Sequence, residues 1–321
     1  MSAPRARAAL TPAARALAGQ LSAAFPPLGP GTDIPALRRA TAQEPARLPA
    51  VASVTDRTIP GPAGAPPLPV RIYRDRVPAD GTAEAPPVVV FFHGGGFVLC
   101  DLETHDGLCR ALAAGTGAVV VSVAYRLAPE HPAPAAVEDA YAALRWAADP
   151  GSRHGGDHGR VAVAGDSAGA NLAAMACLTA RDRRGPAPVA QLLAYPALDP
   201  RLRTRSAGEF GTGHFLTTAH LRWYWEQYLG GAAPSAAVSP SLATDLRGLP
   251  PALLVEAECD PLRDEGREYA ARLPRAEVHT APGMFHGFLA YAQLLPEAAE
   301  ALAASAAWLR ARLAPAAPVQ G

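Results

Sequence analysis

The chain has 321 residues, of which 49% are hydrophobic, so it is long enough to bury the core of one large α/β domain or of two modest ones. Its 29 basic and 29 acidic residues cancel, and no basic block indicates binding to nucleic acid or to an anionic membrane. The sequence contains no lysine, which excludes mechanisms that need a lysine Schiff base, a P-loop lysine or a serine–lysine pair.

Residues 1–50 are expected to form one or two short helices, separated by the turn-rich segment PPLGPGTDIP. Pro12 and Arg15 interrupt the apolar stretch near the start, so no secretory signal is expected, and no run of about 18 apolar residues predicts a membrane span. Four widely spaced cysteines without a CxxC pattern indicate free thiols in a reduced protein. These features together predict a cytoplasmic location.

From residue 70 onward, short apolar or β-branched segments alternate with helical patterns. The expected strands are VRIYRDR, PPVVVFFHG, GAVVVSVAYR, RVAVAGDS, AQLLAYP and PALLVEAE. This alternation predicts an α/β fold with a mostly parallel sheet that is covered by helices on both faces. Residues 201–245 contain no expected strand, and the aromatic helix LTTAHLRWYWEQYLGG predicts an insertion outside the sheet. The pattern PEAAEALAASAAWLRARL predicts a last amphipathic helix.

The pentapeptide GDSAG, Gly165 to Gly169, follows the expected strand RVAVA and precedes a helix. In a G-x-S-x-G turn of this kind the serine stands clear of the sheet at a helix N-terminus, and the sharp turn requires small residues two positions before and after it. An ordinary glycine-rich turn is the alternative, but few accidental matches fall at a strand–helix junction. Ser167 is therefore the predicted nucleophile.

A serine nucleophile needs a base that is oriented by a third group. Functional residues of a parallel sheet lie beyond the carboxyl ends of its strands, and Asp260 follows the strand PALLVEAE. Of the nine histidines, only His279 and His286 come after Asp260. The segment AEVHTAPGMFHGF predicts a strand through His279, then a Pro–Gly turn, and then a loop that carries His286. His286 is therefore the predicted base.

Two carboxylates compete for the role of the third group. Glu258 and Asp260 lie two positions apart at the end of the same strand, so the alternation of side chains does not separate them. Pro261 favours Asp260, because it fixes the chain in a turn directly after this short side chain.

The segment HGGG, beginning at His93, ends the expected strand VVVFF. Alone, it fits a flexible turn equally well. Before a G-x-S-x-G motif, it predicts backbone N–H donors that stabilise the oxyanion formed during ester attack, because glycine lets the backbone approach the substrate. The predicted donors are Gly95, Gly96 and Ala168.

Taken together, the chain resembles the hormone-sensitive lipase-like family of α/β-hydrolases, which includes bacterial carboxylesterases with an HGGG loop. The resemblance covers most of the chain from about residue 51 and rests on FFHGGGFVL, VSVAYRLAPEHPAPA, GDSAGANLAA, LPPALLVEAECDPLRDEGREYA and PGMFHGF in family order. It implies a Ser167, Asp260 and His286 triad, with the acid placed before the dipeptide Pro261–Leu262.

The resemblance also implies a domain organisation and a substrate class. Residues 51–321 would form the catalytic domain, and residues 1–50 and 201–245 would form a helical cap. Short- to medium-chain carboxylic esters would be the substrates, and no metal or cofactor would be needed. An amide, carbamate or lactone substrate stays open, because pocket walls decide the substrate. A non-catalytic receptor on this fold is disfavoured by the intact triad. The sequence leaves the oligomeric state open, including a homodimer.

Several other residues are expected to have structural roles. His93 is expected to brace the glycine loop, and Arg126 and Glu130 in YRLAPE to lock a turn by ion pairing. The aromatic residues of the segment WYWEQY are expected to form a packing face, with one or two of them also lining the acyl pocket.

Overall fold

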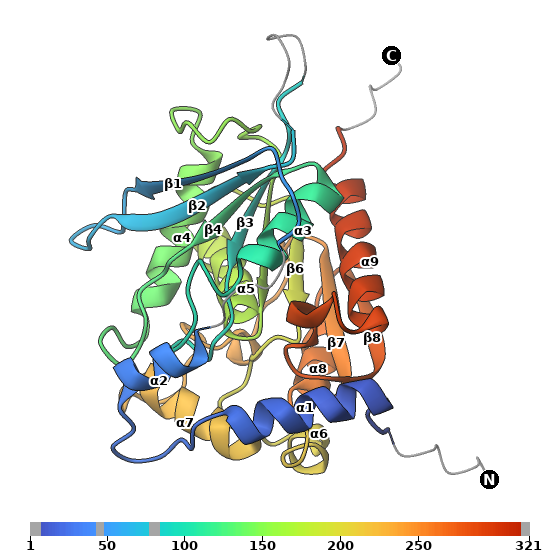
Figure 1. Cartoon of the computed structure of the whole chain (residues 1–321). Coiled ribbons are helices and arrows are strands. Elements are labelled where there is room, and N and C mark those ends of the chain that lie inside the picture. The colour runs from blue at the N-terminus through green and yellow to red at the C-terminus, as the bar shows by residue number, and fades with distance from the viewer. Residues whose placement is uncertain (1–7, 43–47, 77–83, 316–321) are drawn as a thin grey trace.

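The computed structural model describes residues 8–42, 48–76 and 84–315. One eight-stranded sheet forms the middle layer of the molecule, in the order β1-β2-β4-β3-β5-β6-β7-β8 (Figure 1). Its strands are β1 (Ser53–Ile59), β2 (Leu68–Arg74), β3 (Val88–Phe92), β4 (Val119–Val123), β5 (Val161–Asp166), β6 (Gln191–Ala194), β7 (Ala252–Cys259) and β8 (Ala276–Phe285).

Strand β2 pairs antiparallel with β1 on one side and with β4 on the other, and all other neighbouring strands pair parallel. Every residue of β3, β4 and β5 is buried, as expected for parallel strands covered on both faces. The predicted mostly parallel α/β fold is thus confirmed. Strand β1 was not predicted, because its central residues Asp56, Arg57 and Thr58 are polar and exposed.

The two faces of the sheet belong to separate apolar clusters, because successive side chains of a strand point to opposite faces. Val90 belongs to the cluster that includes residues of α4 (Ala135–Ala148), α5 (Ala168–Asp182) and α8 (Arg263–Ala270). Its neighbour Phe91 faces α3 (Asp106–Thr116) and the last helix, α9 (Pro296–Arg312).

The remaining helices lie at one end of the sheet, the lower end in Figure 1. They are α1 (Pro12–Ala24), α2 (Ile34–Thr41), α6 (Arg205–Glu209) and α7 (Thr218–Leu229), with short 3₁₀ turns at η1 (Pro240–Leu242) and η2 (Phe288–Tyr291). Segments distant in sequence meet here: the indole N–H of Trp223 in α7 donates to the carbonyl of Gly29, between α1 and α2, at 3.2 Å. Of residues 1–50, those numbered 1–7 and 43–47 lie outside the described part of the chain.

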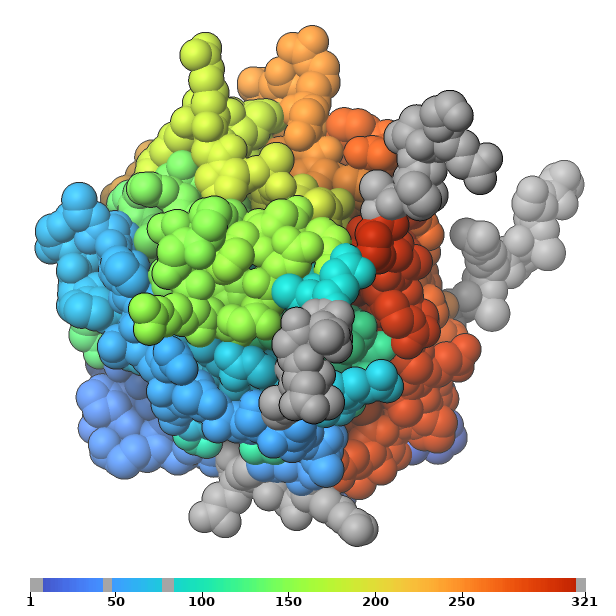
Figure 2. All heavy atoms as spheres, turned by 90° about the horizontal axis from the view of Figure 1, so that it is seen from above, coloured from blue at the N-terminus to red at the C-terminus, as the bar shows by residue number. Residues whose placement is uncertain are grey.

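The opposite end of the molecule, which faces the viewer in Figure 2, is built from the loops that lead into the strands. The chain near residue 150, coloured green there, packs over this end, and His154 within it is fully buried. Within the described ranges, no helix combines the length and the apolar character needed to cross a membrane.

Candidate active site

Ser167 lies in the turn between β5 and α5, in a backbone conformation that is rare for a residue with a side chain (φ 53°, ψ −117°). Its N–H donates to the carbonyl of Ala194 at 2.8 Å, and its carbonyl accepts from Ala197 N–H at 3.2 Å. Hydrogen bonds on both sides of the serine therefore hold the strained turn in place.

The glycines on either side of Ser167 are required by close backbone contacts. A Cβ atom on Gly165 would lie 2.3 Å from the carbonyl oxygen of Gly169, and a Cβ atom on Gly169 would lie 1.9 Å from that of Phe92. No larger side chain fits without moving the backbone, which is the steric reason that the sequence motif suggests.

The structure brings Ser167, Asp260 and His286 together at the carboxyl ends of β5, β7 and β8. Nε2 of His286 lies 2.8 Å from Oγ of Ser167, and Nδ1 of His286 lies 2.7 Å from Oδ2 of Asp260. Asp260 is fully buried, and its other oxygen, Oδ1, accepts the N–H of Leu262 at 2.8 Å. One carboxylate oxygen is therefore reserved for the histidine.

Glu258 binds the backbone near His286: its Oε2 accepts the N–H of Gly283 at 2.8 Å. The predicted turn at Pro282 and Gly283 is wrong, because β8 continues through both residues and carries an irregularity in its pairing with β7. Gly283 takes a positive φ there, and β8 is an edge strand, where the missing N–H of Pro282 is tolerated. Gly283 also accepts the N–H of Thr11 at 3.1 Å, which joins the start of α1 to this strand.

The glycine loop lies beside the serine. Gly95 and Gly96 have φ angles of 105° and 61° and both line the cavity in front of Ser167. A Cβ atom on Gly96 would lie 2.3 Å from the ring of Tyr224, so only glycine fits there. Ala168 is the first residue of α5, and the N–H groups of a first helical turn have no acceptor within the helix.

Asp166, the second residue of GDSAG, holds this loop in place, a role that the sequence reasoning missed. Its Oδ1 accepts the N–H of Gly94 at 2.9 Å and lies 3.1 Å from Nε2 of His105. Burial opposes the charge, but the imidazole of His105 keeps the pKa of Asp166 below its usual value. Burying a carboxyl group at the end of a strand costs free energy unless the group has partners. This cost was the signal from which a structural role of Asp166 could have been predicted.

His93 lies under the glycine loop. Its Nδ1 is 2.8 Å from the carbonyl oxygen of Gly94, and its ring stacks on that of Tyr125 at 4.4 Å. The hydroxyl of Tyr125 donates to the carbonyl of His93 at 2.7 Å. Burial lowers the pKa of His93 to about 4, so the ring is neutral near pH 7 and suits the bracing role expected of it.

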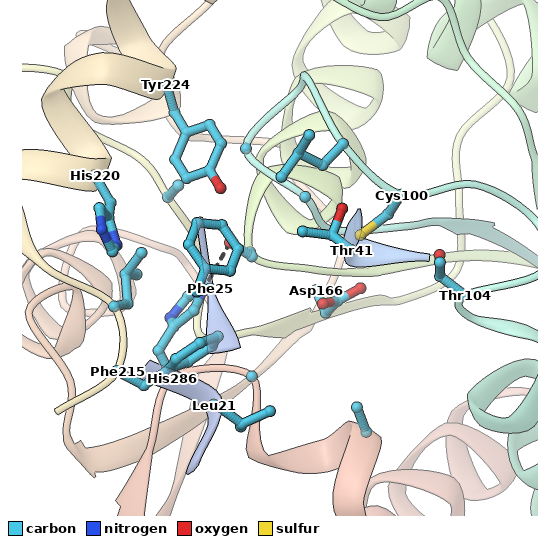
Figure 3. A pocket seen from close by; sticks show the side chains of 18 of the residues that line it. Leu21, Phe25, Thr41, Cys100, Thr104, Asp166, Phe215, His220, Tyr224 and His286 are labelled. Atoms are coloured by element: carbon cyan, nitrogen blue, oxygen red, sulfur yellow. Dashed lines mark hydrogen bonds between the residues drawn. The ribbon is translucent and has the colours of Figure 1, made fainter. Parts of the chain in front are cut away.

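A cavity of about 600 Å³ opens in front of Ser167. Its walls come from α1, α2, α7, the glycine loop and the chain after His286. In Figure 3, Phe25, Phe215, His220, Tyr224 and His286 lie on one side of it, and Thr41, Cys100, Thr104 and Asp166 lie on the other.

The aromatic residues of α7 divide between packing and the cavity. Tyr228 stacks on Phe97 with ring centroids 3.7 Å apart, whereas Tyr224 and Trp225 line the cavity. The expected packing face is therefore present, and two of its aromatic residues line the cavity.

Arg126 and Glu130 of the segment YRLAPE form ion pairs with residues outside this segment, instead of holding its turn together as expected. Arg126 pairs with the buried carboxylate of Asp139 in α4, at 2.7 Å. Glu130 pairs instead with Arg38 of α2, also at 2.7 Å. Arg38 further donates to the carbonyl oxygens of Val98 and Ala128. The sequence did not show these partners, because both lie on elements that only the fold brings close.

The described residues contain no group of three or more histidine, cysteine or acidic side chains arranged to hold a metal ion. All four cysteines are free thiols, and burial raises the pKa of Cys100, which lines the cavity, to about 12.

The chain is similar to several known proteins. The sequence model of a family described as alpha/beta hydrolase fold matches residues 89–290. The chain is 49% identical over 253 residues to the carboxylic ester hydrolase LipN of Mycobacterium tuberculosis, covering 75% of this chain and 65% of that protein. It is 43% identical over 270 residues to the carboxylesterase NlhH of the same species, covering 81% of this chain and 83% of that protein.

Solved structures show the same similarity over nearly the whole chain. A hyperthermophilic esterase from the archaeon Pyrobaculum calidifontis has a TM-score of 0.82 and 42% identity, and the match covers 94% of this chain and 98% of that one. An ester-hydrolase from the metagenome of Lake Arreo has a TM-score of 0.85 and 38% identity over the same shares.

Proposed function

Since the chain belongs to the α/β-hydrolase family, among the carboxylic ester hydrolases related to hormone-sensitive lipase, we propose that it hydrolyses short- to medium-chain esters through an acyl-enzyme on Ser167. The observation that carries this proposal is the continuous hydrogen-bonded series from Ser167 through His286 to Asp260. It opens onto a cavity large enough for a small ester.

In the first step, Oγ of Ser167 attacks the ester carbonyl carbon while Nε2 of His286 takes its proton. A Ser167–carbon bond forms, and the carbonyl electron pair moves onto the oxygen. Asp260 keeps the imidazole in the tautomer that leaves Nε2 free to accept, and it stabilises the imidazolium that results.

The new negative charge on the substrate oxygen requires donors that are already in place. The N–H groups of Gly95, Gly96 and Ala168 are our assignment for these donors, supported by the position of the two glycines on the cavity wall and of Ala168 at a helix N-terminus. Donors fixed in this way need no rearrangement when the charge develops.

The imidazolium of His286 then gives its proton to the leaving alkoxy oxygen, the carbon–oxygen bond breaks, and the alcohol departs. Water repeats the sequence: His286 removes one of its protons, the hydroxide oxygen bonds to the acyl carbon, and the proton returns to Oγ of Ser167 as the acid leaves. One water is consumed for each ester.

We also infer a domain organisation, which the same arrangement supports. Residues 51–321 form the catalytic domain in this proposal, and residues 1–50 and 201–245 form the cap. Supporting it, α1, α2 and α7 all contribute to the cavity wall, and Phe25 contacts both Phe215 and His220.

Four free thiols are consistent with a reducing, cytoplasmic location.

The decisive experiment is Ser167→Ala. We expect a folded protein whose kcat on a p-nitrophenyl ester falls by about three orders of magnitude or more. A fluorophosphonate probe should label the wild type on Ser167 and fail to label the variant. Normal turnover by Ser167→Ala would remove this serine as the nucleophile.

A further inference from the structure

The aromatic side of the cavity contains a second imidazole besides that of His286. His220 of α7 packs against Phe25, the residue after α1, with ring centroids 5.4 Å apart, and Phe25 meets Phe215 edge to face at 6.1 Å. All three residues line the cavity. His220 therefore adds a group able to form hydrogen bonds beside these two phenylalanine rings.

The imidazole has capacity to spare for a ligand. Within the described part of the chain, neither ring nitrogen of His220 has a hydrogen-bond partner; its backbone N–H donates to Oγ1 of Thr217. Burial lowers the pKa of His220, so the ring is neutral near pH 7. A neutral imidazole offers one N–H donor and one acceptor nitrogen.

The mechanism indicates which part of an ester lies on this side. The leaving oxygen must receive its proton from Nε2 of His286 and therefore departs toward that residue. His286 lies on the same side of the cavity as Phe25, Phe215 and His220, opposite Thr41 and Thr104 (Figure 3). Phe215 also packs edge to face on Phe285, the residue before His286, at 6.1 Å.

We propose that the aromatic side of the cavity binds the alcohol part of the ester, and that His220 selects aryl alcohols that carry a hydrogen-bonding substituent. This inference rests on the proposed function. The ring of the alcohol would stack among Phe25, Phe215 and Tyr224, and its polar substituent would reach the imidazole. The acyl group would lie on the side of Thr41 and Thr104.

The test compares matched esters on the wild type and on His220→Phe, which keeps an aromatic ring and removes both nitrogens. Phenyl acetate and 4-hydroxyphenyl acetate differ only in a hydroxyl on the alcohol. Methyl benzoate and methyl 4-hydroxybenzoate place the same hydroxyl on the acyl side. Within each pair, the ratio of kcat/KM is measured, so that differences in intrinsic reactivity cancel between the two proteins.

The hydroxylated acetate should lose its advantage in His220→Phe by about three- to tenfold, the range that one neutral hydrogen bond supplies. The benzoate ratio should be unchanged. His220→Gln, which keeps a donor and an acceptor, should restore part of the preference. His214→Phe is the matched control, because His214 packs on Phe210 and does not line the cavity.

An acetate ratio that is the same in wild type and His220→Phe would overturn the inference, as would an equal change in the benzoate ratio. In both cases measurable ester hydrolysis leaves the proposed function standing. Failure of the wild type to hydrolyse any of the four esters or to react with fluorophosphonate would overturn both.

Discussion

Asp260→Asn is expected to lower kcat by roughly 10³- to 10⁴-fold with little change in fold. Oδ1 of Asp260 accepts the N–H of Leu262, so an asparagine would place its oxygen there and turn its NH₂ group toward Nδ1 of His286. An NH₂ group donates and does not accept, so Nδ1 would lose its proton and Nε2 would carry it. In that tautomer His286 cannot accept the proton of Ser167.

The expected loss corresponds to about 4 to 5.5 kcal/mol of transition-state stabilisation. The assay is kcat and KM on p-nitrophenyl butyrate, with a thermal melt to establish that the variant folds. Glu258→Gln is the matched control, because its amide oxygen still accepts the N–H of Gly283, and its kcat should fall less than about tenfold. If Glu258→Gln proved the more damaging of the two, the acid would have been assigned to the wrong residue.

Three further outcomes are expected. Asp166→Asn weakens the hydrogen bond to Gly94 and should lower kcat about 10- to 100-fold with little change in KM. The reason is that the donors of the glycine loop act mainly in the transition state. A rise in KM alone would contradict this role. Burial raises the pKa of the Glu265 carboxyl group well above its usual value. The folded protein therefore loses stability as the pH rises above the pKa that Glu265 has in the unfolded chain. The loss is up to about 1.4 kcal/mol of unfolding free energy per pH unit and ends when the pH reaches the pKa of Glu265 in the folded protein. Glu265→Gln keeps an oxygen for the N–H of Leu198 and should flatten this decline in urea titrations between about pH 5 and pH 8, whereas an unchanged pH dependence would show that Glu265 is not its source. Activity on p-nitrophenyl esters should rise with acyl length to about eight carbons and then fall, since each buried CH₂ contributes about 0.8 kcal/mol only until the cavity ends; a preference for emulsified long-chain triglycerides would contradict this.

Much of the fold and the candidate site could be predicted because local chemistry specified them. Buried parallel strands must be apolar throughout, so segments such as VVVFF and RVAVA stand out from the chain. The turn around Ser167 allows only small residues at Gly165 and Gly169, so a steric requirement appears directly as a motif. Asp260 was separated from Glu258 by the proline that follows it.

The errors share a physical cause, which is that distant elements decided the outcome. Pro282 and Gly283 are typical of a turn, but Ala281 and Phe285 on either side of them pair with β7, and the carboxylate of Glu258 binds Gly283, so the strand continues through both residues. Strand β1 is polar because it lies at the edge of the sheet, so it lacks the apolar pattern of the inner strands. The contact of Asp166 with Gly94 joins residues far apart in sequence, so the cost of burying this carboxyl group indicates that a partner is needed but not which one.

The N-terminal helices have a consequence for how such enzymes diversify. They supply a wall of the cavity, yet they meet the rest of the chain through contacts such as Arg38 with Glu130 and Thr11 with Gly283, none of which uses a side chain of Ser167, Asp260 or His286. Mutations at Leu21 in α1 or at Phe25 after it would therefore reshape the pocket without replacing a residue of the proposed triad. Substrate preference is free to evolve faster than the catalytic machinery, and a library aimed at new substrates would begin with Leu21 and Phe25.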